Sequence, residues 1–278
     1  DDPLWQSDAL LYLRQAGAVR ITGLLKGDKH TAPAKRRMRS LYRATVNTTL
    51  QAASKSSSVP HETTNTTLQA AGRKHIAVSL LEPPLANALA AAAPKLMPFL
   101  CKALSCDGKV SEDKADRRGQ VHDDEPLSLR IVESGLLTSI PGALPQPLHS
   151  DVANDQPAEC TTLKIQFGFG EVTEGMGPTE LVPGSVASPP VAHPTDDSAA
   201  VPLPLPLGSV VIYDARAWHR GGANKSGKPR PLYYLTVVDD GCAPPMGLPY
   251  TIEPSEVACF SLSPKGVRRR GTRRCQAK

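Results

Sequence analysis

The chain has 278 residues, of which 40% are hydrophobic, and this excludes a protein that is disordered throughout. The most apolar stretch, residues 80–104, is broken by prolines and lysines, so it is no membrane span, which needs ~20 uninterrupted apolar residues. Seven cations lie within 265–278 and no acid follows Glu256, so the net charge of +5 becomes −2 once these seven are set aside. The body of the protein is therefore not basic.

Six cysteines are scattered along the chain without C-x-x-C spacing. This pattern favours free thiols in a reducing compartment over a disulfide framework, and it predicts a cytoplasmic protein. The chain opens with Asp1 rather than Met, so a removed signal or transit peptide stays an alternative. Three N-x-S/T sequons, at Asn47, Asn65 and Asn224, occur too readily by chance to indicate secretion.

The N-terminal part predicts a short helix at 4–16, with leucines on one side, and a strand at 18–25. Residues 1–25 are therefore expected to be the first elements of the main domain. Residues 85–104 are rich in alanine, carry leucines on one side and follow two prolines, and this predicts a second helix.

Residues 26–75 have a different composition, rich in Lys, Arg, Ser and Thr. They contain Asn-Thr-Thr-Leu-Gln-Ala-Ala twice, at 47–53 and at 65–71. One repetition is too little for a solenoid, so the segment is interpreted as a flexible surface insertion with a local duplication.

The second half changes to β character after a charged loop at 107–126. Pro, Gly and Ser clusters separate four apolar or alternating runs, with no helical period between them, at 127–140, 161–172, 209–214 and 232–239. The fold class expected is α+β, mainly β, with a sandwich or jelly-roll barrel in a domain over 76–260 and the N-terminal helices packed on it.

The C-terminal residues 261–278 are predicted to form a disordered basic tail. Arginines at 268–274 could bind phosphates or another anionic partner through counterion release. A solvated tail is the favoured interpretation, because no aromatic side chain follows Phe260 to stack on bases.

The best candidate for a metal site lies at His149 and Asp151. In a strand or at its exit, residues i and i+2 project to the same side, so an imidazole and a carboxylate can reach one ion. The H-x-D pattern is short, and a second copy begins at His122, but that copy lies in a charged run expected to be a solvated loop. His149 instead follows a strand and a series of Pro and Gly turns, which can hold ligands in place.

His219 can supply a third ligand, because it follows the expected buried strand 210–213. Two histidines and one carboxylate on one face of an octahedral metal leave three positions open, as oxygen activation at Fe(II) requires. A zinc hydrolase could use similar ligands, but its tetrahedral site leaves one position and needs a placed general base. Arg230, eleven residues after His219, could bind the distal carboxylate of an iron-chelating 2-oxo acid, which favours 2-oxoglutarate.

Three ordered motifs resemble the phytanoyl-CoA dioxygenase family. They are Pro-Gln-Pro-Leu-His-Ser-Asp at 145–151, Glu-Gly-Met-Gly-Pro-Thr-Glu-Leu-Val-Pro-Gly-Ser at 174–185 and Asp-Ala-Arg-Ala-Trp-His-Arg-Gly-Gly-Ala-Asn at 214–224. The resemblance covers about residues 76–240, with a further likeness at 13–25. It implies a double-stranded β-helix of the jelly-roll or cupin-like kind, Fe(II), 2-oxoglutarate and O₂, with ascorbate as a candidate reductant.

The same resemblance implies that His149, Asp151 and His219 are the catalytic iron ligands and that Arg230 clamps the distal carboxylate. It places Gln166 in the cosubstrate pocket, although a polar residue at a barrel wall is as readily structural. The implied reaction is hydroxylation of a small organic or lipid-like substrate, with release of succinate and CO₂. A non-catalytic jelly-roll module that binds a metal or ligand is the alternative.

The sequence departs from the family at Val186, because family members commonly have His directly after Pro-Gly-Ser. His193 could substitute, but a surface histidine is favoured in this proline-rich loop. Iron binding does not depend on this position, whereas the geometry of the substrate loop could. The loop 185–207 is expected to cover the substrate, and its low charge argues mildly for an apolar or neutral ligand. The Gly-Pro-Thr and Pro-Gly-Ser pieces are expected to determine turns.

Overall fold

The computed structural model describes residues 5–55, 72–104, 129–152, 162–186, 194, 197–239, 248, 251–252, 256, 260–263 and 266–269. The helices are α1 (Trp5–Ala16), α2 (Asp28–Lys55) and α4 (Pro83–Leu104), with 3₁₀ turns η2 (Glu174–Met176) and η3 (Asp197–Ala199). The strands are β1 (Ala18–Ile21), β2 (Arg73–Ala77), β3 (Leu129–Ser139), β4 (Thr162–Phe167), β5 (Thr179–Leu181), β6 (Val201–Pro202), β7 (Val210–Asp214), β8 (His219–Gly221), β9 (Arg230–Asp239), β10 (Phe260–Ser263) and β11 (Gly266–Arg269). None of the described helices is both long and apolar enough to cross a membrane.

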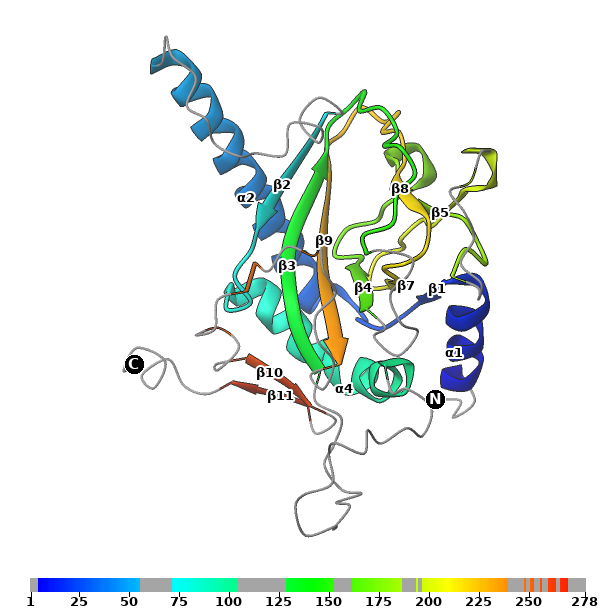
Figure 1. Cartoon of the computed structure of the whole chain (residues 1–278). Helices are drawn as coiled ribbons and strands as arrows, with labels where there is room; N and C mark the ends of the chain where they lie inside the picture. The colour runs from blue at the N-terminus through cyan, green and yellow to red at the C-terminus, as the bar shows by residue number, and fades with distance from the viewer. Residues whose placement is uncertain are drawn as a thin grey trace, which may run out of the picture.

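The strands form two antiparallel sheets (Figure 1). The larger sheet has the order β1-β7-β4-β9-β3-β10-β11, with β2 also paired to β3, and the smaller sheet has the order β6-β5-β8. This arrangement confirms the mainly β, jelly-roll fold expected from the sequence. The helices at the N-terminal end and the four long strands lie where the apolar patterns predicted them, to within a few residues at each end.

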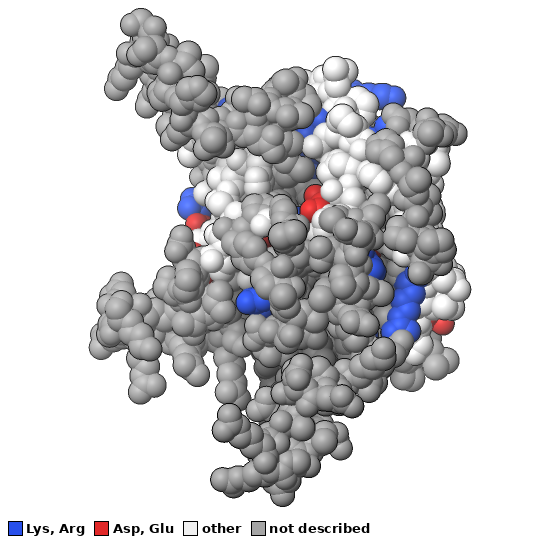
Figure 2. All heavy atoms as spheres, in the orientation of Figure 1, with Lys and Arg blue, Asp and Glu red and all other residues white. Residues whose placement is uncertain are grey.

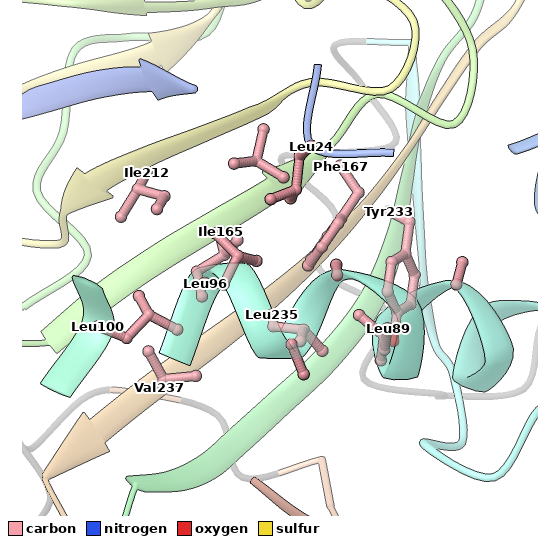
Figure 3. Packing of buried hydrophobic residues seen from close by; sticks show 14 of the residues in the cluster. Leu24, Leu89, Leu96, Leu100, Ile165, Phe167, Ile212, Tyr233, Leu235 and Val237 are labelled. Carbon is pink, nitrogen blue, oxygen red and sulfur yellow. The ribbon is translucent and has the colours of Figure 1, made fainter. Parts of the chain in front are cut away.

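The main hydrophobic core lies between α4 and one face of the larger sheet. Figure 3 shows leucines of α4 pointing toward apolar side chains of β4 and β9. Alternation explains this packing, because residues two apart on a strand share a face. On β4, the side chains of Leu163, Ile165 and Phe167 belong to this core, and those of the intervening Lys164 and Gln166 face the opposite way.

That opposite face of the larger sheet is turned toward the smaller sheet and is rich in polar side chains. A β-bulge between Ile131 and Glu133 shifts the register of β3 against β9. Because a shift of one residue moves a side chain to the other face, the bulge allows Glu133 to point inward while Ile131 packs in the core. The sequence pattern gave no sign of this bulge.

Part of the segment 26–75, which the sequence predicted as a flexible surface insertion, is helical and packs on the core. Residues 28–55 form α2, and Ala34 and Met38 of this helix are buried in the main core. Arg37 ties α2 to the start of α4 through two hydrogen bonds to the Glu82 carboxylate, at 2.7 and 3.0 Å. The helix was missed because small and polar residues make up most of its buried side. Residues 56–71, with the second copy of the duplication, lie outside the described residues.

The segment 261–278, which the sequence predicted as a disordered basic tail, includes parts of two short strands. Strands β10 and β11 pair with each other, and Leu262 pairs with Leu129 of β3. Backbone pairing at the sheet edge orders these residues in spite of the nearby arginines. On the face of the molecule seen in Figure 2, the described Lys and Arg side chains stand at separate places rather than in one continuous patch. The charged loop at 107–126 lies outside the described residues, as do His122 and His193.

Candidate metal centre

The structure brings together the three side chains that the sequence proposed as metal ligands. One nitrogen or oxygen atom from each of His149, Asp151 and His219 lies within 4.8 Å of the other two. The Nε2 atoms of His149 and His219 are 3.8 and 3.5 Å from the nearer oxygens of Asp151. Ligand atoms bound to one ion at about 2 Å can be no more than about 4 Å apart, so small side-chain adjustments would let all three bind a single ion.

Backbone hydrogen bonds fix this arrangement between segments that are distant in sequence. His149 and His219 form an antiparallel bridge in which each amide donates to the other's carbonyl, both at 2.9 Å. The amide of Asp151 donates to the carbonyl of Ala215 at 3.0 Å. The sequence placed His219 just past a strand. It opens the short strand β8, which carries its imidazole into the barrel.

Both imidazoles are oriented by the carbonyl two residues earlier in the chain. Nδ1 of His149 lies 3.0 Å from the Pro147 carbonyl, and Nδ1 of His219 lies 2.9 Å from the Ala217 carbonyl. A carbonyl oxygen only accepts, so Nδ1 donates in both rings and Nε2 keeps its lone pair for a metal. Burial, and then the neighbouring His219 ring, lower the pKa of His149, which favours the neutral form that a metal needs.

The carboxylate of Asp151 faces a buried cation that the sequence analysis did not single out. Nζ of Lys164 on β4 lies 3.3 Å from Asp151 Oδ2 and 2.8 Å from Glu133 Oε2. Burial alone would raise the pKa of Asp151, but Lys164 and then the two imidazoles outweigh it and hold that pKa well below its usual range. Burial likewise opposes the charge on Lys164, but the two carboxylates outweigh it and raise its pKa.

A polar network extends from this lysine across the inner face of the sheet. Glu133 accepts hydrogen bonds from Thr236 at 2.7 Å and from the hydroxyl of Tyr234. The hydroxyl of Tyr234 also lies 2.6 Å from Nε2 of His75 on β2. The ammonium group of Lys164 and both oxygens of Glu133 thus have polar partners, which offsets the cost of burying the two charges.

Arg230 is another buried cation of this face. It is 1% exposed, and its Nε and Nη2 atoms have no hydrogen-bond partner among the described residues. Burial, and then the nearby guanidinium of Arg73, lower the pKa of Arg230 to about 9. Ser139 pairs with Arg73 on one side and with Arg230 on the other, and its buried hydroxyl also has no partner in the described part of the chain. Such a cluster of unsatisfied donors fits a bound carboxylate.

Gln166 lies on the inner face, as expected of a residue in a cosubstrate pocket. Its amide nitrogen donates to the hydroxyl of Thr179 at 2.8 Å and lies 3.4 Å from the hydroxyl of Tyr213. Since Thr179 belongs to β5, this contact joins the two sheets. The ring of Tyr213 in turn contacts that of His219, with centroids 4.9 Å apart. Gln166 therefore has a structural task beside the predicted role in the pocket.

Val186, which stands where the family commonly has His, packs against apolar neighbours. It joins the cluster that contains Ala217, and its methyl groups lie 3.4 Å from where a side chain on Gly17 would begin. The side chain of Val186 thus helps to pack the turn after β5 against the end of α1. Part of the loop expected to cover the substrate, residues 187–193 and 195–196, lies outside the described residues.

Gly177 occupies the turn of the Gly-Pro-Thr motif and supports the interpretation of that motif as a turn determinant. Its φ is +67°, and a Cβ atom there would lie 2.3 Å from the carbonyl oxygen of Gly222. We expect Gly177→Ala to lower the free energy of unfolding by about 2 kcal/mol or more, measured by urea denaturation. Gly175→Ala is the matched control, because nothing lies within 4 Å of its added Cβ. Equal stability of the two variants would contradict this account.

The fold and the cluster define a jelly-roll protein with two histidines and one carboxylate facing into the barrel. The chain belongs to the phytanoyl-CoA dioxygenase (PhyH) family, whose model matches residues 13–232. Curated relatives are uncharacterized proteins of Mycobacterium tuberculosis and Mycobacterium bovis, each 30% identical over 95 residues. The aligned part is 33% of this chain and 34% of each relative, so the chain spans about a third of the length of these proteins.

Solved structures of similar fold include an epimerase, SnoN, in complex with Fe³⁺, alpha ketoglutarate and nogalamycin RO. The chain is 19% identical to it, each chain is covered to 89%, and the TM-score is 0.57. Another structure of SnoN, described as a non-heme alpha ketoglutarate dependent epimerase from nogalamycin biosynthesis, gives a TM-score of 0.59 at 18% identity, with 90% and 87% of the two chains covered. AviO1 from Streptomyces viridochromogenes Tue57 gives 0.54 at 16% identity, with 88% and 100% covered. At these identities the likeness shows the shared fold.

Proposed function

We propose that the protein is an Fe(II)- and 2-oxoglutarate-dependent dioxygenase that hydroxylates a small organic substrate and releases succinate and CO₂. The observation that carries the proposal is a buried guanidinium, that of Arg230, with no anionic partner among the residues that the structure describes, on the same inner face as a converging His-Asp-His cluster. A metal cluster alone would suit several chemistries. A separate carboxylate site beside it favours a cosubstrate with two acidic ends.

In this proposal, His149, Asp151 and His219 hold the iron, and the hydrogen bonds at their Nδ1 atoms keep the imidazoles in the ligating tautomer. Arg230, with Ser139 beside it, binds the distal carboxylate of 2-oxoglutarate. When bound, iron with 2-oxoglutarate and O₂ supplies the oxidation that converts a C–H bond of the substrate to C–OH and yields succinate and CO₂. The chain contributes orientation and exclusion of water, because the smaller sheet covers the inner face, while the helices pack on the opposite face of the larger sheet and hold it rigid.

Anaerobic calorimetry tests this proposal in the full chain. Fe(II) is titrated first, 2-oxoglutarate second, and air is then admitted while succinate is measured. We expect one metal per chain, metal-dependent binding of 2-oxoglutarate, and slow succinate release that a true substrate accelerates. A panel of neutral, apolar and acyl-thioester compounds, scored by stimulated succinate release, then defines the substrate class.

Metal binding without any binding of 2-oxoglutarate would contradict the proposal and favour a jelly-roll module that binds a metal without catalysis. Binding of 2-oxoglutarate that does not depend on metal would contradict it as well, because chelation at the iron is part of the proposed site.

A further inference from the structure

The ion pair between Lys164 and Asp151 engages only one of the two carboxylate oxygens. Nζ of Lys164 lies 3.3 Å from Oδ2 of Asp151, and Glu133 holds the same ammonium group from the other side at 2.8 Å. The side chains of Lys164 and Glu133 are 7% and 3% exposed, against 24% for Asp151. The lysine is therefore anchored in the barrel wall, and the carboxylate lies toward the open side.

The number of oxygens that Asp151 gives to a metal decides how many positions remain for other ligands. An octahedral ion with two imidazoles and one carboxylate oxygen keeps three positions open. A carboxylate that binds through both oxygens would leave two, and a chelating 2-oxo acid would take both. The proposed reaction needs the third position for O₂, so a single ligating oxygen is a requirement of the function.

We propose that Lys164, held by Glu133, is a positioning residue that keeps Asp151 to one ligating oxygen. This inference rests on the proposed function and deepens it. Oδ2 lies 3.3 Å from the ammonium group and 3.5 Å from Nε2 of His219, whereas Oδ1 lies 3.8 Å from Nε2 of His149. In the proposed arrangement the ammonium group keeps Oδ2 and leaves Oδ1 for the ion. Glu133 fixes the ammonium group and is in turn fixed by Thr236 and Tyr234, so the lysine cannot follow the carboxylate toward the metal. The same pairing keeps the buried carboxylate of Glu133 from becoming an extra ligand.

Register explains why these residues meet. Thr236 of β9 pairs with Glu133 of β3 on one side and with Lys164 of β4 on the other, so the three side chains lie in one row across the inner face. Asp151 approaches this row from the segment tied to Ala215. The lysine is thus placed by three strands of the sheet, which is the rigid kind of support that a ligand needs.

The test uses the double variant Lys164→Met/Glu133→Gln in the full chain. The double change removes one cation and one anion, so the net charge stays the same and neither Lys164 nor Glu133 is left as a charge without the other. The carboxylate of Asp151 loses its lysine partner, but its side chain is 24% exposed and lies toward the open side. The glutamine oxygen can accept from one of the hydroxyls of Thr236 and Tyr234, and its NH2 group can donate to the other hydroxyl. Two dissociation constants are measured anaerobically, that of Fe(II) and that of 2-oxoglutarate for the iron-loaded protein. Lys225→Met, an exposed lysine on the turn before β9, is the control.

We expect the double variant to bind Fe(II) at least as tightly as the wild type, because the second oxygen of Asp151 becomes available. Its affinity for 2-oxoglutarate should fall about tenfold or more, since a position needed for chelation is taken. The visible absorption of Co(II) bound in place of iron should also differ between the variant and the wild type, because it depends on coordination number. A thermal midpoint near that of the wild type would show that the variant is folded.

Dissociation constants unchanged for both Fe(II) and 2-oxoglutarate would overturn the inference. An equal loss of affinity for both ligands would also overturn it, because it indicates a general disturbance of the barrel. Failure of the proposed function gives a different result, because then the wild type itself binds no 2-oxoglutarate. In that case the inference about Lys164 fails as well.

Discussion

Replacing Arg230 with methionine is expected to stabilise the protein and to abolish its response to 2-oxoglutarate. The guanidinium is 1% exposed and has two nitrogens without partners in the described structure. A buried charge without a counter-ion is costly, and an apolar side chain of similar length removes that cost. We expect the free energy of unfolding of the metal-free protein to rise by about 1–3 kcal/mol, measured by urea denaturation.

The same variant is expected to lose the stabilisation that the ligand gives. For the wild type loaded with metal, 2-oxoglutarate at 100 times its dissociation constant should add about 2.7 kcal/mol to the free energy of unfolding. Arg230→Met should show no such gain at the same concentration. Arg39→Met, which changes an exposed arginine of α2, controls for the loss of one positive charge. A variant less stable than the wild type would mean that Arg230 is held by contacts within the protein and does not await an anion.

Asp151→Asn is expected to reduce the affinity for Fe(II) by more than about a hundredfold. Loss of an outer partner of a ligand typically costs about 10- to 100-fold, and here a charged ligand itself is lost. The two histidines should stay in place, because their backbone bridge and their Nδ1 hydrogen bonds do not involve the carboxylate. Succinate formation should disappear with the iron. Anaerobic titration with Fe(II) measures the first effect, and product analysis after exposure to air measures the second.

Asp8→Asn, at an exposed position of α1, is the matched control for this change. Circular dichroism of Asp151→Asn should match that of the wild type, because Lys164 keeps Glu133 as a partner. Retention of iron affinity within tenfold of the wild type would remove Asp151 from the proposed ligand set.

The sequence predicted the ligands of the candidate site because each carried a local signal. His149 and Asp151 share one side of a short segment, and His219 follows a buried strand that opens with the apolar run 210–212. The motif order also led to the family, which the family model confirms. Arg230 is the first residue of β9, just ahead of the run 232–239 that the sequence predicted as a strand. The roles given to these residues and to Gln166 remain predictions that the proposed experiments address.

What the sequence left hidden depends on register and on small residues. Lys164 lies two residues before Gln166 in β4, so the two side chains share a face of the strand. This spacing could have indicated that Lys164 points inward. Its partnership with Glu133 could not be predicted, because the bulge in β3 decides which face that carboxylate takes. Helix α2 was missed because its buried side, where the structure describes the side chains, consists of only three residues of mixed type. Their helical spacing is visible only when Thr31, Ala34 and Met38 are considered together.

His149 and His219 have two roles, because they form a reciprocal backbone bridge within the barrel and their side chains form part of the candidate metal site. Breaking this bridge would separate the two imidazoles, so an ion that binds to both can bind only while the bridge is intact. By thermodynamic linkage, a shortage of the metal in the cell would raise the fraction of molecules in which this bridge is broken and the chain is open to proteases. Supply of the ion would then set how long the protein survives as well as whether it works.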